Sequence, residues 1–312
     1  MSHLDILGVE AFVAVAELGS INAAANSLYL SPTGLSRRLK KLEDGLGITL
    51  ITRTTRSVAL TKEGSRLLPR ARQTLRDLGD ALDDMKKGSE HRRGRVRFSC
   101  LTTLSPRLLP PLLNSYANQF PANQVQALPM TAFESKDALL SGDIDFAISL
   151  AGAPHPALDM ERIFKEHIIA LCNSDHPLAR HKSISWEDLE QGGPLIGLGL
   201  RISAQAMIDA MALHAQIRLN WLYEVDVPSA LELVAGNVGI AILPELSVAK
   251  MLSAYDNVKI IKLRPPFTRE ISLIRRKLPM SSAAESLYEA ARTLLNDVAR
   301  TSVRAVDTPT LL

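Results

Sequence analysis

Two serines, Ser20 and Ser31, divide the start of the chain into short helical segments and constrain its fold more than any other feature. Serine is a favoured helix N-cap, because its hydroxyl accepts a hydrogen bond from an otherwise unpaired backbone N–H. Gly19 precedes the first serine and ends a segment whose apolar residues repeat with helical spacing. Pro32 follows the second serine at the first helical position, where a missing N–H costs nothing. The pattern predicts one helix before Gly19, one at 21–28 and one at 32–44.

The second and third predicted helices are joined by a tight turn, Tyr29–Leu30, and form a helix-turn-helix pattern. In this motif the early residues of the second helix enter the major groove of DNA, while its apolar side packs inward. Here the inward side carries Leu35, Leu39 and Leu42, at spacings of four and three. The opposite side is predicted to read base edges with Thr33, Ser36 and Arg37, and to touch phosphates with Arg38, Lys40 and Lys41.

Positive charge is concentrated in the same region. The whole chain carries a formal net charge of +3, but residues 31–76 hold eleven Lys and Arg against three Asp and Glu, a net +8 that leaves the rest at −5. Clustered cations favour a polyanionic partner, because they displace the counterions condensed on DNA. A charge run by itself is also typical of a solvated helix face. The helix-turn-helix pattern therefore decides in favour of double-stranded DNA.

Two short β-prone runs, 49–53 and 56–60, follow the third helix and predict a β-hairpin wing. Arg53 and Arg56 stand at the tip of this hairpin. A guanidinium fits a narrow minor groove, where the negative potential is enhanced. We therefore predict that both arginines contact DNA; the alternative is that they are ordinary exposed surface residues.

A long fourth helix begins after its N-cap, Thr61, and is predicted to pair two chains. Its apolar residues step mostly by three and four, which makes a seam for a partner helix. A DNA-binding unit with such a seam is typical of a dimer that reads two half-sites. The alternative is that the seam packs on its own chain. The predicted dimerisation residues are Leu67, Ala71, Leu75, Leu78, Leu82 and Met85.

The remaining two hundred residues have a different pattern. A chain of 312 residues exceeds one ordinary core and suits two or three compact units. After a short polar and basic hinge at 89–95, β-prone and helical runs alternate in one set over 95–150 and a second set over 168–235. Alternating β and α segments predict a mostly parallel sheet flanked by helices. Two such sets predict two α/β lobes with a cleft between them.

The chain resembles the LysR-type transcriptional regulators nearly end to end in the stretch FVAVAELGSINAAANSLYLSPTGLSRRLKKLEDGLGITLITRTTRSVALTKEG. Weaker motifs continue the resemblance in order: LLPPLLNSYANQFP, SGDIDFAIS, HPLA and LVAGNVGIAILP. The chain departs from the family at Pro32–Leu35, where many members have Gln-Pro-Ala-Val. A base-reading Gln is absent there, and Thr33 is expected to inherit its role.

The resemblance implies an all-α winged helix-turn-helix with a long linker helix, followed by a two-lobed α/β domain similar to periplasmic solute-binding proteins. In that family the chain crosses between the lobes twice, here near Ile163 and near Pro265. The family also implies a dimer of dimers, in which the sensor lobes supply the second contact. The expected divisions are a DNA-binding domain at 1–61, a linker helix at 62–88, a hinge at 89–94, and an effector-binding domain at 95–312, with lobe I at 95–163 and 267–302 and lobe II at 164–266.

The predicted ligand site lies between the lobes. In open α/β sheets a ligand binds beyond the carboxyl ends of strands, against helix N-termini with unpaired N–H groups. Thr103 matches the position where members of the family often place an effector-binding hydroxyl. We predict a small anionic effector held by Thr102 or Thr103 and nearby amides; the alternative is that both threonines only cap the helix. Further predicted cleft residues are Thr131, Ala132, Gly199, Arg201, Val227 and Ser229, with Arg201 neutralising an acidic ligand.

Catalysis, a metal and a cofactor are not predicted. The seven histidines give no pair at metal-ligand spacing, and His167 with Cys172 lacks a third group for nucleophilic catalysis. No apolar run reaches about 18 residues, and the start lacks the features of a signal peptide, so we expect a cytoplasmic protein without membrane contact. Cys100 and Cys172 are interpreted as buried thiols rather than a disulfide.

These features predict a sequence-specific DNA-binding transcriptional regulator controlled by a small-molecule effector. Its expected partners are promoter DNA, the effector, further copies of itself and RNA polymerase. Two alternatives stay open: an effector-independent regulator whose cleft is filled by its own side chains, and a solute-binding protein or enzyme with an accessory helical domain. The +8 segment and the wing arginines argue against the second alternative.

Overall fold

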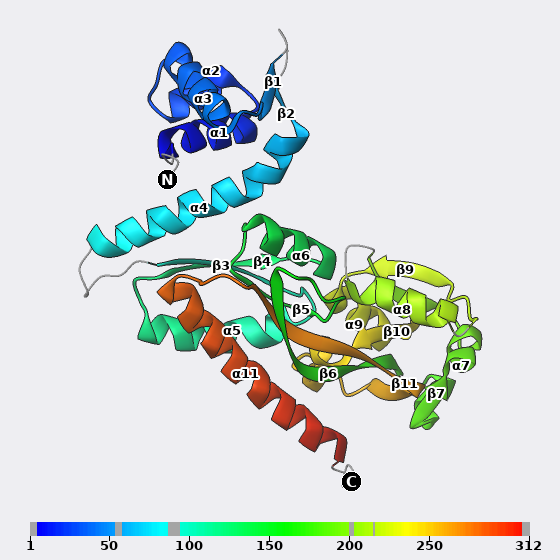
Figure 1. Cartoon of the computed structure of the whole chain (residues 1–312). Helices are drawn as coiled ribbons and strands as arrows, with labels where there is room; N and C mark the ends of the chain where they lie inside the picture. The colour runs from blue at the N-terminus through cyan, green and yellow to red at the C-terminus, as the bar shows by residue number, and fades with distance from the viewer. Residues whose placement is uncertain (1–4, 54–57, 87–93, 200–202, 215, 308–312) are drawn as a thin grey trace. The chain divides into compact units, whose positions relative to one another are not determined.

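The computed structural model describes residues 5–53, 58–86, 94–199, 203–214 and 216–307 (Figure 1). The chain divides into two compact units: an N-terminal unit of Met1–Gly94 with the short segment Leu140–Asp143, and a C-terminal unit of Arg95–Leu139 and Ile144–Leu312. No helix among the described residues is both long and apolar enough to cross a membrane.

The N-terminal unit begins with three helices, α1 (Ile6–Leu18), α2 (Ile21–Ser27) and α3 (Pro32–Leu46). The hydroxyls of Ser20 and Ser31 cap α2 and α3 as predicted, accepting from the N–H of Ala23 (3.3 Å) and Gly34 (3.1 Å). The predicted end of α3 at residue 44 is two residues too early. Gly45 stays helical, and Gly47 ends the helix in the left-handed conformation (φ 68°), where glycine has no Cβ to clash.

A β-hairpin and a long helix complete this unit. The hairpin pairs β1 (Ile51–Arg53) with β2 (Val58–Leu60) in antiparallel fashion, with Ile51 opposite Leu60. α4 (Lys62–Lys86) follows directly, and the hydroxyl of Thr61 caps it by accepting from the N–H of Gly64 (2.9 Å). The core of the unit gathers buried side chains from α1, α2, α3, β1 and α4, namely Ala11, Phe12, Val13, Val15, Ala24, Ala25, Leu35, Leu39, Leu42, Leu50, Ile51 and Ala71.

The C-terminal unit contains two α/β lobes joined by two long strands. The first lobe holds β3 (Arg95–Cys100), α5 (Ser105–Gln119), β4 (Gln124–Pro129), α6 (Ala132–Ser141), β5 (Phe146–Leu150) and α11 (Ser282–Asp307). The second holds β7 (Ser183–Ser185), α7 (Trp186–Gln191), β8 (Leu195–Leu198), α8 (Ser203–His214), β9 (Trp221–Val225), α9 (Val227–Ala235), β10 (Ile240–Pro244) and α10 (Glu245–Val248). Short 3-10 turns lie at Pro177–Arg180 and Leu252–Ala254.

Two strands, β6 (Leu158–Asn173) and β11 (Val258–Arg276), run through both lobes as antiparallel neighbours. The strand order is β4-β3-β5-β11-β6-β10-β8-β9, with β7 pairing to β11. Apart from pairs that involve β6 or β11, neighbouring strands within each lobe are parallel, as the alternating sequence predicted: β3 pairs with β4 and β5, and β8 pairs with β9 and β10. The sequence indicated only residues 168–173 of β6 as a strand, because the polar run before them does not alternate cleanly.

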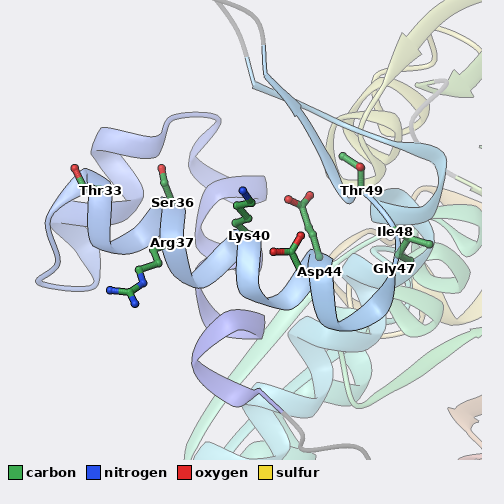
Figure 2. A pocket seen from close by; sticks show the side chains of 9 residues that line it. Thr33, Ser36, Arg37, Lys40, Asp44, Gly47, Ile48 and Thr49 are labelled. Atoms are coloured by element: carbon green, nitrogen blue, oxygen red, sulfur yellow. The ribbon is translucent and has the colours of Figure 1, made fainter.

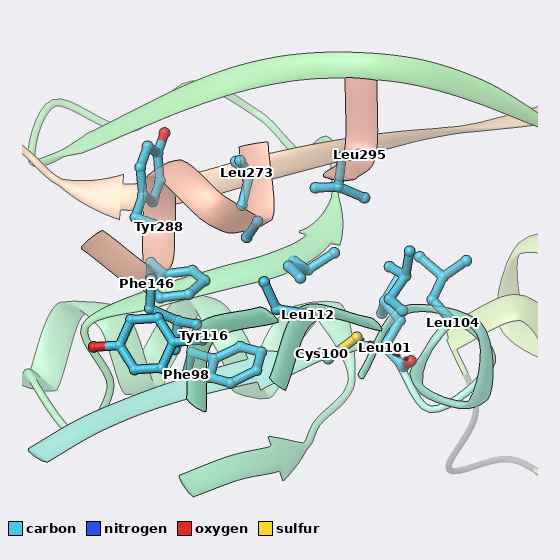
Figure 3. Close-up of a cluster of buried hydrophobic side chains, with 14 of the residues drawn as sticks. Phe98, Cys100, Leu101, Leu104, Leu112, Tyr116, Phe146, Leu273, Tyr288 and Leu295 are labelled. Carbon is cyan, nitrogen blue, oxygen red and sulfur yellow. Dashed lines mark hydrogen bonds between the residues drawn. The ribbon is translucent and has the colours of Figure 1, made fainter. Parts of the chain in front are cut away.

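Each lobe has its own core. In lobe I, side chains of β3, β5, β11, α5 and α11 pack together (Figure 3). Phe98 stacks on Phe146 with ring centroids 5.0 Å apart, and Tyr288 meets Phe146 edge-on at 5.5 Å. In lobe II, buried clusters form on both faces of the sheet, as a sheet covered by helices on both sides requires. On β6, Phe164 packs against the core of lobe I and Ile168 belongs to a core of lobe II. The boundary between the lobes therefore lies between these two residues of the strand.

Candidate DNA interface and effector site

The exposed face of α3 carries the residues predicted to read DNA. Thr33, Arg37 and Lys40 are exposed and Ser36 is half-buried, whereas Leu35, Leu39 and Leu42 lie in the core. Figure 2 shows Thr33, Ser36, Arg37 and Lys40 in order along one side of the helix. They line a groove of about 850 Å³. The arrangement presents hydroxyl and guanidinium donors at the N-terminal part of the helix, where a recognition helix meets base edges.

The groove also contains residues that the sequence did not single out. Asp44, Gly47, Ile48 and Thr49 continue it beyond the basic residues towards the hairpin. A helical repeat points to Asp44, since it follows Lys40 by four residues on the same face. Gly47–Thr49 belong to the turn after α3, and no helical repeat reaches them.

The remaining predicted phosphate contacts have mixed settings. Arg38 is half-buried, and Lys41 is 78% exposed with its ammonium 3.8 Å from the carboxylate of Asp5. The backbone of Arg53 lies at the end of β1. Arg56 lies outside the described residues.

The structure corrects part of the predicted dimerisation seam on α4. Ala71 is only 5% exposed and belongs to the core of its own unit, and Leu67 and Leu75 pack against that core. The spacing rule did not separate these positions, because a seam facing the core of its own unit has the same period as one facing a second chain. Leu78 and Leu82 are 37% and 47% exposed and stay available for a partner. The side chain of Met85 lies outside the described part of the structure.

In the C-terminal unit, the two threonines after β3 have different surroundings. Thr102 is exposed, whereas Thr103 is only 3% exposed. Neither caps α5, since the N-cap position is Leu104 and no side chain bonds there. The backbone carbonyl of Leu101 accepts hydrogen bonds from the N–H groups of Leu104 (2.8 Å) and Ser105 (3.0 Å). In the described part of the chain, the backbone N–H groups of Thr102 and Thr103 have no acceptor.

A buried ion pair contacts Thr103. Arg269 on β11 and Glu166 on β6 are cross-strand partners, and Arg269 Nε lies 2.7 Å from Glu166 Oε2, with both side chains 1% exposed. Arg269 Nη2 donates to the hydroxyl of Thr103 (2.8 Å), and the N–H of Leu246 donates to Glu166 Oε1 (2.9 Å). Burial raises the pKa of the Glu166 carboxyl, while Arg269 acts in the opposite direction. No pattern in the sequence predicts this pair, since the two residues are 103 positions apart.

At two other helix starts in this unit, a backbone N–H already donates to an acidic side chain of the same chain. At α6, the N–H of Thr131 donates to the Glu134 carboxylate (2.8 Å), and the hydroxyl of Thr131 accepts from the N–H of Glu134 (3.2 Å). At α9, the carboxylate of Asp226 accepts from the N–H of Ser229 (2.9 Å), and hydrogen bonds with Ser229 lower the pKa of Asp226. The start of α5 differs, because no acidic side chain caps it.

The other predicted cleft residues are scattered. The N–H of Ala132 donates to the hydroxyl of Ser203 on α8 (3.0 Å), a bond that joins lobe I to lobe II. Gly199 is half-buried, with its N–H 3.4 Å from the carbonyl of Val225. The prediction that Val227 lines the cleft is corrected by the structure. Its side chain is 8% exposed and packs in the core of lobe II, because the first turn of α9 places it inward. Arg201 lies outside the described residues.

Both cysteines are free and buried. Burial raises the pKa of Cys100 to about 12 and that of Cys172 to about 11. Both thiols therefore stay protonated near neutral pH, where only the thiolate is reactive. Across the described ranges there is no group of three or more His, Cys, Asp or Glu that suits a metal ion.

Comparison with known proteins covers almost the whole chain. Residues 8–65 match the family of bacterial regulatory helix-turn-helix proteins, lysR family, and residues 89–296 match the LysR substrate binding domain. The HTH-type transcriptional regulator YbhD of Escherichia coli, itself uncharacterized, is 31% identical over 300 residues, which is 95% of this chain and 93% of YbhD.

Solved structures share the fold. A full-length OxyR variant from Pseudomonas aeruginosa superposes with a TM-score of 0.71 at 21% identity, covering 96% of this chain and 98% of that one. Full-length CbnR in complex with its target DNA gives a TM-score of 0.59 at 24% identity, with coverages of 93% and 99%.

Proposed function

The chain belongs to the LysR family of DNA-binding transcriptional regulators, and from this premise we propose that its effector-binding domain senses a small carboxylate at the start of α5. The supporting observation is that this helix start is uncapped, while those of α6 and α9 are occupied by Glu134 and Asp226. The N–H groups of Ser105 and Arg107 in the first turn of α5 are already paired, so the donors for an anion are the N–H groups of Thr102 and Thr103 just before the helix, where the helix dipole also favours negative charge.

The groups around this site are hydrogen-bond donors. The hydroxyl of Thr103 accepts from Arg269, so its own hydrogen is available to donate. The N–H groups of Thr102 and Thr103 point to the same kind of partner, since each needs an acceptor. A carboxylate oxygen is a stronger acceptor than an amide oxygen, because charge-assisted hydrogen bonds are about twice as strong as neutral ones.

A screen with the full-length protein tests this proposal. A panel of small carboxylic acids and their primary amides is scored by the shift in melting temperature, and the best acid is then titrated by calorimetry. Thr103→Val should weaken its binding roughly tenfold or more, since one hydrogen bond to a charged group is worth about 1.5–3 kcal/mol. Thr103→Ser keeps the hydroxyl and should bind nearly as well, and Thr102→Val is the matched exposed control.

An effector-independent regulator is the second candidate, and one observation favours it. The lobes are already bridged by the chain itself, through Ala132–Ser203 and through the Glu166–Arg269 pair with Thr103 and Leu246. If no carboxylate raises the melting temperature and Thr103→Val leaves transcriptional output unchanged, this second candidate replaces the first.

The assembly on DNA is part of the same proposal. We propose a dimer through α4 that reads two half-sites, and a dimer of dimers as the full regulator, acting on RNA polymerase at the promoter. The exposed apolar residues Leu78 and Leu82 support the first contact.

A further inference from the structure

Glu43 lies near the end of the recognition helix α3, and its carboxylate reaches the base of the wing. One oxygen, Oε1, accepts hydrogen bonds from the backbone N–H groups of Leu50 (2.7 Å) and Ile51 (3.1 Å). The side chains of Leu50 and Ile51 are buried, at 0% and 3% exposure, so this stretch of backbone sits against the core rather than in water. Two N–H groups at the edge of the core therefore depend on one acidic side chain of the recognition helix.

The start of α4 holds the same stretch of backbone. The N–H of Thr61 donates to the carbonyl of Leu50 (3.0 Å), and the hydroxyl of Thr61 donates to the carbonyl of Thr49 (2.8 Å). Gly64 makes this approach possible, because a Cβ there would lie 2.1 Å from the carbonyl oxygen of Leu50. The base of the wing is thus fixed to α3 on one side and to α4 on the other.

The position of the wing depends on this base. β1 and β2 have three residues each and pair with one another. A lone two-stranded hairpin is marginally stable in water, so its direction is set by what its base is attached to. The groove described above runs from Thr33 on α3 to Thr49 at this base, and Glu43 lies in its lining.

We propose that Glu43 is a positioning residue for DNA binding: it holds the wing at the distance from α3 at which helix and wing engage neighbouring grooves of one duplex. Its negative charge is unfavourable for binding, because a carboxylate in this groove repels the phosphates of a bound duplex. The role therefore belongs to the acceptor oxygen: an uncharged amide oxygen of the same shape makes weaker hydrogen bonds but keeps their geometry, and it removes the repulsion from the phosphates.

The experiment uses the full-length protein and a duplex that the wild type selects from a random-sequence pool. Glu43→Gln keeps an oxygen at Oε1 and should bind this duplex within about twofold of wild type or more tightly. Glu43→Ala removes the acceptor and should bind at least roughly tenfold more weakly, which corresponds to about 1.4 kcal/mol.

A double-mutant cycle separates positioning from loss of stability. Arg53→Ala, at the end of β1, should weaken binding in the wild type but have almost no further effect in Glu43→Ala, because the wing is already misplaced. Lys40→Ala, on α3 itself, should weaken binding by the same factor in both backgrounds. Circular dichroism at the assay temperature verifies folding; if Glu43→Ala does not fold, the shorter Glu43→Asp takes its place.

Two results would overturn the proposal. One is an equal cost of Arg53→Ala with and without Glu43, which would make the wing independent of this residue. The other is a loss in Glu43→Gln as large as in Glu43→Ala, which would assign the effect to the charge.

Discussion

The two units of this protein place their polar side chains in opposite ways. On α3, the residues proposed to meet DNA lie within fifteen consecutive residues on the outside of one helix. In the C-terminal unit, the polar side chains of Thr103, Glu166 and Arg269 form a buried cluster that joins residues up to 166 positions apart. DNA reaches an exposed face directly, whereas a small molecule is recognised where water is excluded. Changing an exposed charge on α3 should therefore alter affinity for DNA with little effect on the stability of the fold. Changing a charge in the buried cluster should alter both ligand affinity and stability.

The largest expected effect follows from breaking the buried pair. Arg269→Met leaves Glu166 unpaired in the interior and should lower the free energy of unfolding by about 3–5 kcal/mol. Both tryptophans, Trp186 and Trp221, belong to the C-terminal unit, so fluorescence during urea unfolding reports on this unit alone.

An exposed pair on the same two strands is the matched control. Arg162 Nε lies 3.3 Å from Glu270 Oε2, with the side chains 59% and 31% exposed. Arg162→Met should cost no more than about 1 kcal/mol. Replacing both buried partners, with Glu166→Leu and Arg269→Met together, should recover most of the loss. Equal costs for Arg162→Met and Arg269→Met would contradict the contrast between buried and exposed charge.

The second prediction concerns Leu78 and Leu82, two apolar residues of α4 that are exposed in the single chain. Leu78→Asp with Leu82→Asp should separate the chains paired through α4 and weaken binding to the selected duplex roughly hundredfold, or about 2.7 kcal/mol, since one half-site is lost. Sedimentation velocity should show a smaller particle. Leu278→Asp, at a leucine that is 59% exposed outside α4, is the control and should change neither measurement. An unchanged particle in the double variant would mean that the chains associate elsewhere.

The third and smallest effect distinguishes two residues on the exposed face of α3. Arg37→Ala should cost about 1–3 kcal/mol on the selected duplex and little on random DNA, because a contact to a base edge carries sequence information. Lys40→Ala should weaken both duplexes alike and reduce the slope of log affinity against log salt by about one. Filter binding over a range of salt concentrations measures both. If the two variants lose affinity equally on both duplexes, the division between base and phosphate contacts fails.

The difference between the units also explains what was predictable. Caps at Ser20, Ser31 and Thr61, the inward side of α3 and the hairpin after it were predicted from residues close together in the chain. The end of α3 was misplaced by two residues, because either Gly45 or Gly47 is able to end a helix and only the turn at Gly47 is left-handed. On α4, the period of the apolar residues was right, but Ala71 turned out to belong to its own core.

In the C-terminal unit the sequence pointed to Thr103 as a candidate ligand residue, which stays a prediction, and gave no indication of the residues that Thr103 contacts. The alternation of β and α segments predicted two lobes and pointed to the ends of strands as the place for a ligand. It did not show that β6 and β11 run as neighbours through both lobes, which is what brings Glu166 and Arg269 together.

By itself the sequence therefore determined the helix-turn-helix, the inward and outward sides of its second helix and the α/β character of the rest, because caps, helical periods and strand alternation act over a few residues. Only the tertiary structure decided which helix starts are already filled by acids, that Ala71 on α4 is buried while Leu78 and Leu82 are exposed, and how the wing is attached to α3 and α4. These features depend on contacts between segments distant in the chain, and hydrogen bonds and burial of that kind leave no periodic pattern in the residues that form them.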